Sequence, residues 1–425
     1  MGKTIPVCCG VDVHKKFLVA TILTGDYLIP QCKQKHFGTS YRNLLAFRQW
    51  LLENECKDVC MESTGKYWVP VWNVLESSVH VVIANPKWVS AVKGNKDDKK
   101  DSKWIGNLFR MGLVPESYIP GNDIRILREF TRYRSKLVSM RSSEKCRFQN
   151  AFTVCNMTLD AVVSDMFGKS ATDIENYLLE TDFVDPAHCV SLLQKSLKKK
   201  ADAVVEAVEG FNMTFEQKKR VRIIQGHFVD IDKRISQIDE IVNHLVAEYE
   251  SQISLLCTVP GIDRRLAVTI ISEIGTDMSE FGSSRKLCAW AGLAPGSNQS
   301  AGKKKSVKIT RAGVYLKPAL VEAAHAAVMS TEKQPYFRMK YERIMKRRGK
   351  KRAIIAIARM ILTSIFSMLS SGEVFNPSDL LKYDMPEELK KKITLASAKD
   401  AVKLLVSLGV VEEGSISLDS LALAG

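Results

Sequence analysis

The chain has 425 residues, of which 45% are hydrophobic and 26% charged, values close to the average of globular proteins. That length allows two or three domains, and the composition excludes a largely disordered chain. Lys and Arg number 62 against 47 Asp and Glu, a net charge of +15, which favours a polyanionic partner, either nucleic acid or an anionic membrane surface.

Two further features bear on where the protein works. The longest apolar run, residues 353–369, is interrupted by Arg359 and by three hydroxyl side chains, so we expect no membrane span. The ten cysteines form no CxxC pair and no regular spacing, which is typical of reduced thiols and excludes a disulfide scaffold or a zinc ribbon. We therefore expect a cytoplasmic protein.

Strands and helices alternate in the first region of the chain. The β-rich runs 7–13 and 17–23 predict a hairpin, residues 27–37 predict a third strand, and residues 59–61 and 79–84 read as buried strands. Helices are expected from an N-cap at Thr39 through Leu52, around residues 68–75, and from residue 98 onwards. The order β-β-β-α-β-α-β-α predicts a mixed sheet flanked by helices.

Long helices are expected after residue 121. Ile126, Phe130, Tyr133, Leu137 and Met140 predict one amphipathic stripe, and Arg128, Arg132 and Lys136 form a separate basic stripe. Between residues 221 and 249 apolar residues keep a 3-4 spacing over four heptads, after a predicted capping box at Thr214 and Gln217. This pattern favours a coiled coil, either between chains or on the earlier helix; the core face of a helical bundle is the alternative.

The third region begins near residue 255. Residues 257–262 precede a helix through Glu273, a second helix spans about 285–290, and a loop rich in Gly, Ser and Lys covers 292–308. A basic helix is expected over 333–352 and a buried helix over 353–369, followed after Pro377 by a tail with two small helices.

Four acidic side chains of the first region fall on three predicted elements. Asp12 lies inside an apolar strand, where a lone carboxylate is costly unless a cation or a donor satisfies it. Glu62 ends another apolar strand, and Asp98 and Asp101 share one face at the start of a predicted helix. Such clusters hold Mg²⁺, and two ions can clamp the attacking and leaving oxygens of a phosphodiester. As alternatives, Asp98 and Asp101 fit a solvated charge run or helix N-terminal acids, and Glu62 fits a helix cap.

Three motifs around these acids resemble those of a bacterial transposase family. They are GVDVHK at residues 10–15, MESTG at 61–65, and KDDKKD at 96–101 followed by Trp104-Ile105. They are similar to the N-terminal RuvC-like DEDD domain of the insertion-sequence 110 family, DNA recombinases guided by a bridge RNA. The resemblance implies an α/β RNase H-like fold and makes Asp12, Glu62, Asp98 and Asp101 the catalytic tetrad of a two-ion Mg²⁺ site. The family usually has Thr where this chain has Asp97, so either Asp97 or Asp98 is the third ligand; the spacing to Asp101 favours Asp98.

The Gly/Ser/Lys loop contains candidate nucleophiles. From Ser300 to Leu320 there are six Lys or Arg and no acid, and a positive environment helps a serine hydroxyl to lose its proton. The lysines would also stabilise charge on a phosphorus under attack. On composition alone a flexible, DNA-contacting loop in which Ser300 only hydrogen-bonds phosphate is the better explanation, and Ser297 or Ser306 is as good a candidate as Ser300.

Residues 255–320 resemble the C-terminal domain of the same family. The matching motifs, in family order, are PGI at 260–262, EIG at 273–275, WAGLAP at 290–295 and SAGK at 300–303. The resemblance places the catalytic serine at Ser300, although most members have Gly where this chain has Ala301. Residues 259–262 also resemble a helix-hairpin-helix, whose amides bind phosphate. Asp263 would repel a phosphate there, so a packing turn is the alternative.

The region 333–352 contains ten Lys and Arg against one acid, with aromatic residues interleaved. This favours nucleic-acid contact over a solvated helix face. The histidines, by contrast, fall in no spacing typical of a ligand set or a triad. Together with the loop, the expected nucleic-acid-binding residues are Lys303, Lys304, Lys305, Lys308, Arg311, Arg338, Arg343, Arg347, Arg348 and Arg352.

The resemblance implies RNA-guided insertion and excision of an insertion sequence by strand exchange, with Ser300 as nucleophile. The implied partners are DNA (element ends and target), a structured guide RNA from the element, and further copies of the chain in a dimer or tetramer. Composite sites would join the RuvC-like domain of one protomer to the serine domain of another. No P-loop spacing is present, so no nucleotide cofactor is expected, and the protein would be nucleoid-associated when bound to DNA.

The expected domains are a RuvC-like α/β domain over 1–122, an α-helical and coiled-coil region over 123–250, a mainly α serine transposase domain over 251–375, and a tail over 376–425. Two other functions fit the same residues. One is a metal-dependent hydrolytic nuclease acting on branched DNA, and the other is a non-catalytic nucleic-acid-binding protein.

Overall fold

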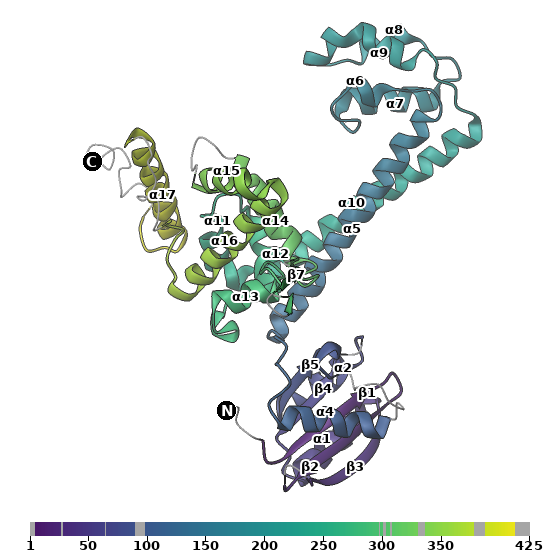
Figure 1. The fold of residues 1–425 in the computed structure, drawn as a ribbon. Coiled ribbons are helices and arrows are strands. Elements are labelled where there is room, and N and C mark those ends of the chain that lie inside the picture. Colours follow the sequence, from purple (N-terminus) through teal and green to yellow (C-terminus); the bar gives the residue numbers. More distant parts are fainter. Residues whose placement is uncertain are drawn as a thin grey trace. The chain divides into compact units, whose positions relative to one another are not determined.

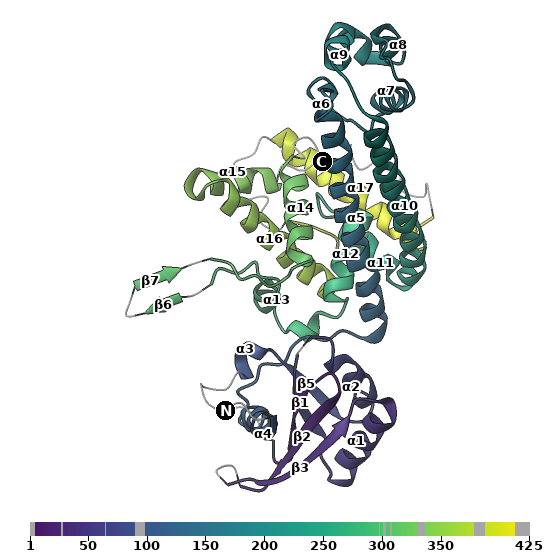
Figure 2. The same cartoon turned by 90° about the vertical axis from the view of Figure 1, so that its right-hand side faces the viewer.

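The computed structural model describes residues 5–26, 29–63, 65–89, 98–296, 298–300, 303–306, 308–329, 336–377 and 387–412. The chain forms two compact units, residues 1–119 and 120–425 (Figures 1 and 2).

The first unit is built on a five-stranded sheet with the order β3-β2-β1-β4-β5. β1 (Cys8–Val13) pairs antiparallel with β2 (Phe17–Thr24), which pairs antiparallel with β3 (Gln31–Gly38). On its other side β1 pairs parallel with β4 (Asp58–Glu62), and β4 pairs parallel with β5 (His80–Ala84). The predicted hairpin, third strand and mixed sheet are confirmed, and the arrangement is compatible with an RNase H-like fold.

Helices cover both faces of this sheet. α1 (Tyr41–Glu53) and α2 (Trp68–Leu75) pack on the face that carries Cys9, Val11 and Val13. α4 (Asp98–Arg110) packs on the face that carries Cys8 and Cys60, and the short α3 (Pro86–Val89) contacts α4. Because side chains alternate along a strand, Gly10 and Asp12 of β1 face α4.

The predicted start of α1 is wrong by one residue. Its N-cap is Ser40, and the Thr39 hydroxyl instead donates to the backbone carbonyl of Lys15, at 2.9 Å. Thr39 therefore fastens the end of β3 to the β1–β2 turn.

Two long helices of the second unit, α5 (Asn122–Thr153) and α10 (Phe215–Leu245), lie side by side (Figures 1 and 2). The predicted capping box at Thr214 and Gln217 is present at the start of α10. Seven of the predicted heptad residues are buried within this single chain, where α10 packs on α5 and, at its start, also on the helices that join the two: Val221, Ile224, Phe228, Ile231, Ile235, Ile238 and Val242.

The predicted apolar stripe of α5 is wrong for three of its five members, whereas its Leu137 is buried and its Phe130 half-buried. Ile126, Tyr133 and Met140 are exposed, whereas Ile124 and Leu127 are buried. The physical reason is that charged residues take part in the α5–α10 contact: Arg134 pairs with Asp239, and Arg141 with Asp232. Hydrophobic periodicity does not detect an interface of that kind.

Residues 154–214, which join α5 to α10, are here called the tip segment. They form α6 (Leu159–Val162), α7 (Lys169–Glu180), α8 (Pro186–Ser191), a 3₁₀ helix η1 (Lys195–Lys200) and α9 (Ala201–Val208). Their apolar side chains share one core with the end of α5 and the start of α10, through Phe148, Phe152 and Phe228.

The remaining helices of the second unit follow α10. They are η2 (Ala247–Tyr249), α11 (Glu250–Cys257), α12 (Arg264–Ile274), η3 (Met278–Phe281), α13 (Ser284–Trp290), α14 (Leu316–Met329), α15 (Tyr336–Arg348), α16 (Lys350–Ser371) and α17 (Glu387–Ser407). The single basic helix predicted over 333–352 is interrupted, because Gly349 has φ +80° and separates α15 from α16. Within its described part, the tail has one helix of 21 residues, α17, in place of the two small helices predicted.

α16 is long and apolar enough to cross a membrane by length and composition, the one such helix among the described residues. Eight of its residues are buried, and it packs against α13, α14 and α15. Over its most apolar stretch, 44% of the helix is buried within the protein.

Candidate active site

Two of the predicted carboxylates lie side by side at the ends of neighbouring parallel strands. β1 and β4 pair with Val11 opposite Met61, so Asp12 and Glu62 occupy the next positions of the same register. Paired positions of parallel strands project to the same face, which here is the face that α4 covers. The Asp12 side chain is only 13% exposed, and Glu62 is half-buried.

α4 crosses this face in close contact with β1. A Cβ at Gly10 would lie 2.1 Å from the carbonyl oxygen of Ser102, so the helix can approach only because residue 10 is glycine. The Ser102 hydroxyl lies 2.7 Å from that of Thr21 on β2. Further along α4, the carbonyl of Gly106 accepts a hydrogen bond from the Cys8 thiol, so α4 runs antiparallel to β1. The first turn of α4 therefore lies toward the Asp12 end of β1.

The helical repeat decides which α4 positions face the sheet. Ser102, Ile105 and Phe109 are buried and follow one another at spacings of three and four residues. Position 98 continues this stripe by one turn toward the start of α4. Asp101 is half-buried next to the stripe. Asp97 lies outside the described residues, as does the side chain of Asp98, so the choice between them stays a prediction, in which the helical position favours Asp98.

The strands and the helix that carry the predicted tetrad come together in the structure. Asp12, Glu62 and the first turn of α4 meet on one side of the sheet. Among the described side chains, no three of His, Cys, Asp or Glu lie close enough to hold a metal ion. The donors are all carboxylates, which suit a hard divalent cation such as Mg²⁺.

His14 is the residue of this site that sequence reasoning missed. Its Nε2 atom lies 3.0 Å from Asp12 Oδ2, and its ring packs at 4.6 Å from that of Phe17. The imidazole thus orients the Asp12 carboxylate. The available signal was its place at the β1–β2 turn, two residues after Asp12.

Ser300 lies in a β-hairpin of the second unit. The predicted loop is in part regular, because β6 (Asn298–Ser300) pairs antiparallel with β7 (Lys303–Ser306), with Ser300 opposite Lys303. A bridge between Pro295 and Ile309 extends the pairing toward the helices. Figure 2 shows this hairpin extending away from the helices of its unit. Ser297, Ala301 and Gly302 lie outside the described residues, as do the side chains of both strands, including those of Ser300, Ser306, Lys303, Lys304 and Lys305.

The other predicted nucleic-acid-binding residues divide into two groups. Lys308 and Arg311 beyond the hairpin are exposed, as are Arg343, Arg347, Arg348 and Arg352 on α15 and α16. Arg338 differs, because it donates to the Glu342 carboxylate and, at 3.3 Å, to the carbonyl of Val328. Its contacts hold α15 to α14.

The helix-hairpin-helix motif between α11 and α12 has the geometry of a packing turn. Gly261 has φ +87°, and a Cβ there would lie 2.4 Å from the carbonyl oxygen of Ala323 on α14. The Asp263 carboxylate accepts a hydrogen bond from the Leu266 amide at 2.8 Å and so caps α12 itself. Of the two alternatives the sequence left open, this favours packing over phosphate binding.

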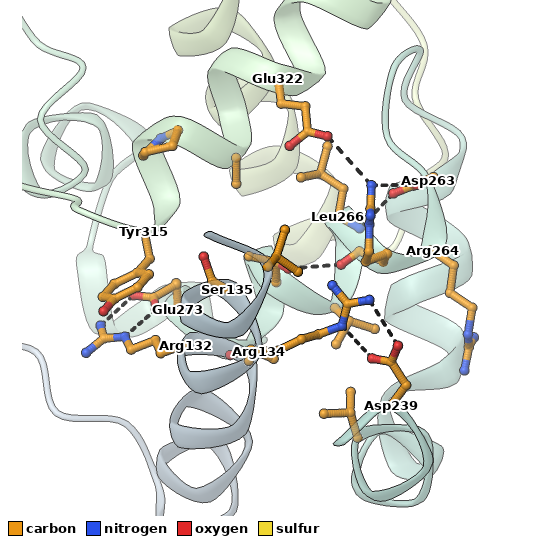
Figure 3. Close-up of a pocket in the computed structure, with 18 of the residues that line it drawn as sticks. Arg132, Arg134, Ser135, Asp239, Asp263, Arg264, Leu266, Glu273, Tyr315 and Glu322 are labelled. Atoms are coloured by element: carbon orange, nitrogen blue, oxygen red, sulfur yellow. Dashed lines mark hydrogen bonds and ion pairs between the residues drawn. The ribbon is translucent and has the colours of Figure 1, made fainter. Parts of the chain in front are cut away.

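A cavity of ≈ 640 Å³ lies where α5 and α10 meet α12 and α14. Figure 3 shows its arginines paired with acids: Arg132 with Glu273 at 2.7 and 2.8 Å, and Arg134 with Asp239. Arg128 donates to the backbone carbonyls of Ser272 and Glu273 at the end of α12. Two members of the predicted basic stripe therefore fasten α5 to α12.

Both regions that carry candidate residues match family models. Residues 9–157 match a transposase model of the DEDD type named for IS110, and residues 253–342 match the model described as "Transposase IS116/IS110/IS902 family". The chain belongs to the IS110 family of transposases.

Curated relatives agree with this assignment. The transposase for insertion sequence element IS1111A of Coxiella burnetii is 24% identical over 177 residues, 40% of this chain and 47% of that protein. The pilin gene-inverting protein of Moraxella bovis is 32% identical over 155 residues, 33% of this chain and 45% of that protein. The chain thus spans a little under half the length of these two relatives. An uncharacterized 42 kDa protein of insertion element IS900 from Mycobacterium paratuberculosis is 24% identical over 301 residues, 67% of this chain and 73% of that protein.

Proposed function

We propose that the protein is a transposase that inserts and excises an insertion sequence by DNA strand exchange, with Ser300 as the nucleophile. The observation that carries the proposal is that the two regions matched by family models contain the candidate catalytic residues. The match over 9–157 contains Asp12, Glu62, Asp98 and Asp101, and the match over 253–342 contains Ser300. The names of the relatives, a transposase and a gene-inverting protein, both describe DNA rearrangement.

In the proposed reaction Ser300 gives up its hydroxyl proton and its Oγ forms a bond to a DNA phosphorus. The bond from that phosphorus to the leaving DNA oxygen breaks, and this oxygen takes up a proton to become a DNA hydroxyl. The phosphoserine link keeps a phosphoester bond, so attack by a DNA hydroxyl releases Ser300 and rejoins a strand without ATP. Lys303, Lys304 and Lys305 lie on β7, which pairs with the strand of Ser300, and supply positive charge for the phosphate.

The four carboxylates would hold two Mg²⁺ ions, and ions bound there would stabilise the charge on the leaving oxygen. The register that aligns Asp12 with Glu62 and the antiparallel run of α4 support this assignment. His14 acts through Asp12, whose carboxylate it orients. It is a positioning residue.

The proposal extends to the partners. DNA and a structured guide RNA would bind the basic surfaces, among which the exposed Arg343, Arg347, Arg348 and Arg352 are the best supported. Base pairing with the guide would supply sequence specificity. The working form would be a homodimer or tetramer, in the cytoplasm and associated with the nucleoid while bound to DNA.

A denaturing pull-down of tagged protein from cells carrying its own element tests the chemistry. We expect DNA that survives boiling in detergent with the wild type and that disappears with Ser300→Ala. Equal amounts of the DNA adduct in both proteins would show that a residue other than Ser300 is the nucleophile. No adduct in either, together with metal-dependent nicking that Asp12→Asn abolishes, would identify a hydrolytic nuclease.

A further inference from the structure

The tip segment differs in charge from the rest of the chain. It contains ten Asp and Glu against five Lys and no Arg, whereas the whole chain has a net charge of +15. Residues 158–252, which contain most of it, lie between the two family matches. Because an acidic surface repels a polyanion, this segment is suited to a basic protein surface rather than to nucleic acid.

One loop of the tip segment presents an aromatic side chain to solvent. Phe183, between α7 and α8, is 88% exposed and is flanked by Glu180, Asp182 and Asp185. Single exposed apolar side chains are common, so exposure alone does not mark a binding site.

The loop around Phe183 is ordered by hydrogen bonds and by an ion pair. The Thr181 hydroxyl donates to the carbonyl of Phe183 at 2.6 Å, and the Asp185 amide donates to the Tyr177 hydroxyl at 2.9 Å. Lys218 on α10 donates to the Asp182 carboxylate at 3.0 Å. Phe183 is therefore held outward on an ordered loop, and an ordered, exposed aromatic residue is the typical anchor of a protein interface.

A surface of matching chemistry lies on α15. An open hollow of ≈ 550 Å³ is lined by Met339, Glu342, Arg343, Lys346 and Arg347. Glu342 is paired with Arg338, so the three other charged side chains make the hollow basic. Met339 gives it an apolar side chain for an aromatic ring.

The two surfaces cannot meet within one chain while α5 and α10 stay paired. α10 has 31 residues, about 45 Å at 1.5 Å per residue, and it separates the tip segment from the helices that follow it. Contact between the Phe183 loop and α15 therefore needs a second copy of the chain. With two-fold symmetry the contact would form twice, each copy giving its loop and its hollow.

We propose that, in the protein free of nucleic acid, the Phe183 loop of one copy docks in the α15 hollow of a second copy. This contact goes beyond the proposed function, because it joins protein to protein and uses no catalytic residue. It places the acidic tip segment against basic side chains that nucleic acid would otherwise bind.

Sedimentation velocity of the full-length chain, freed of nucleic acid, tests the contact. We expect the wild type to self-associate, and to do so less as salt rises, because screening weakens attraction between exposed charges. Phe183→Ser should weaken association at least about tenfold. The matched control is Phe215→Ser: Phe215 is also exposed, at 68%, but lies at the start of α10 with Lys219 over its ring. The Phe215→Ser variant should associate like the wild type.

A charge swap identifies the receiving surface. Glu180→Arg and Arg347→Glu should each weaken association, and the double variant should restore it. A monomeric wild type, or Phe183→Ser with unchanged association, overturns the proposal. Loss in both single variants without rescue in the double variant overturns the assignment to α15. None of these outcomes depends on DNA cleavage, so the recombinase proposal stands or falls separately in the Ser300→Ala pull-down.

Discussion

At Gly10 the sheet and α4 approach more closely than any side chain allows. A Cβ there would lie 2.1 Å from the carbonyl oxygen of Ser102 and 2.3 Å from the Gly106 amide nitrogen, both backbone atoms that cannot rotate away. We expect Gly10→Ala to destabilise the first unit by about 1–3 kcal/mol or more, and to displace Asp98 and Asp101 along with α4. Calorimetry of the full-length chain, with a recombination assay, measures both effects.

Gly226→Ala is the matched control for this change. Gly226 lies inside α10, and apart from the backbone of that helix no atom of the described residues lies within 4 Å of an added Cβ. There the substitution should stabilise the helix by about 0.5–1 kcal/mol, since alanine loses less backbone entropy. Wild-type stability in Gly10→Ala would show that α4 does not pack on β1 as described.

Glu175 makes the stability of the tip segment depend on pH. Burial, and secondarily the nearby Asp165, raises the pKa of its carboxyl from 4.5 to about 8, and Glu175 Oε1 has no hydrogen-bond partner among the described residues. Between these pH values the folded form holds one proton more than the unfolded form, so stability falls as pH rises from about 4.5 to about 8 and is level above. We expect Glu175→Gln to remove this slope and to be the more stable protein at pH 9.

Thermal melts of the wild type and Glu175→Gln at several pH values measure the difference between them. Glu206→Gln, which neutralises an exposed acid on α9, should follow the wild-type curve. A wild-type curve that runs parallel to that of Glu175→Gln across this range would contradict the expectation.

At the scale of elements, one of the contacts between α5 and α12 is an ion pair with a buried acid. The Glu273 side chain is 4% exposed, and Arg132 binds both of its carboxylate oxygens, at 2.7 and 2.8 Å. We expect Arg132→Ala to cost about 3–5 kcal/mol, because it leaves a buried charge without its partner. Chemical denaturation followed by circular dichroism measures the loss.

The pair Arg141–Asp232 provides the comparison for Arg132. It joins the same helix α5 to α10, but its side chains are 33% and 45% exposed, so Arg141→Ala should cost about 0–1 kcal/mol. Equal losses in the two variants would mean that burial of Glu273 does not decide the strength of the contact.

The strands and most helices followed from local pattern, since alternation and caps act over a few residues. The pattern failed where tertiary contacts decide. Sequence periodicity assigned Ile126 and Tyr133 to the buried face of α5, but both are exposed. Arg134 and Arg141 instead take part in the contact between α5 and α10. Gly349 ends α15 through a positive φ that a count of basic residues does not detect.

For the candidate site as well, local sequence patterns revealed some residues, and contacts made in the folded structure decided the others. Asp12 is conspicuous as a charge inside an apolar strand, whereas for Glu62, Asp98 and Asp101 the pattern left other roles open and the resemblance decided between them. The role of His14 depends on how the β1–β2 turn brings its ring back to Asp12, at 3.0 Å, and its position two residues after Asp12 hints at this contact without establishing it. The paired roles of Arg128 and Arg132 depend on α12, more than 130 residues later in the chain.

At the scale of the whole molecule, the candidate catalytic groups are divided between the two units. Asp12, Glu62, Asp98 and Asp101 belong to residues 1–119, and Ser300 belongs to residues 120–425. If the proposed function holds and the sites are composite, one protomer supplies the carboxylates and another supplies the serine. A mixture of two inactive variants then distinguishes a shared site from a site made within one chain.

We expect Asp12→Asn and Ser300→Ala to be inactive alone and to recover part of the activity when co-expressed. In a mixed dimer with shared sites, one site receives both damaged parts, but the other joins the intact carboxylates of the Ser300→Ala chain to the intact serine of the Asp12→Asn chain. A site built within one chain is damaged in both protomers, so the mixture would stay inactive. Recombination of a reporter in cells measures the outcome, and a chain carrying both substitutions, mixed with either single variant, should give none because no site is then complete.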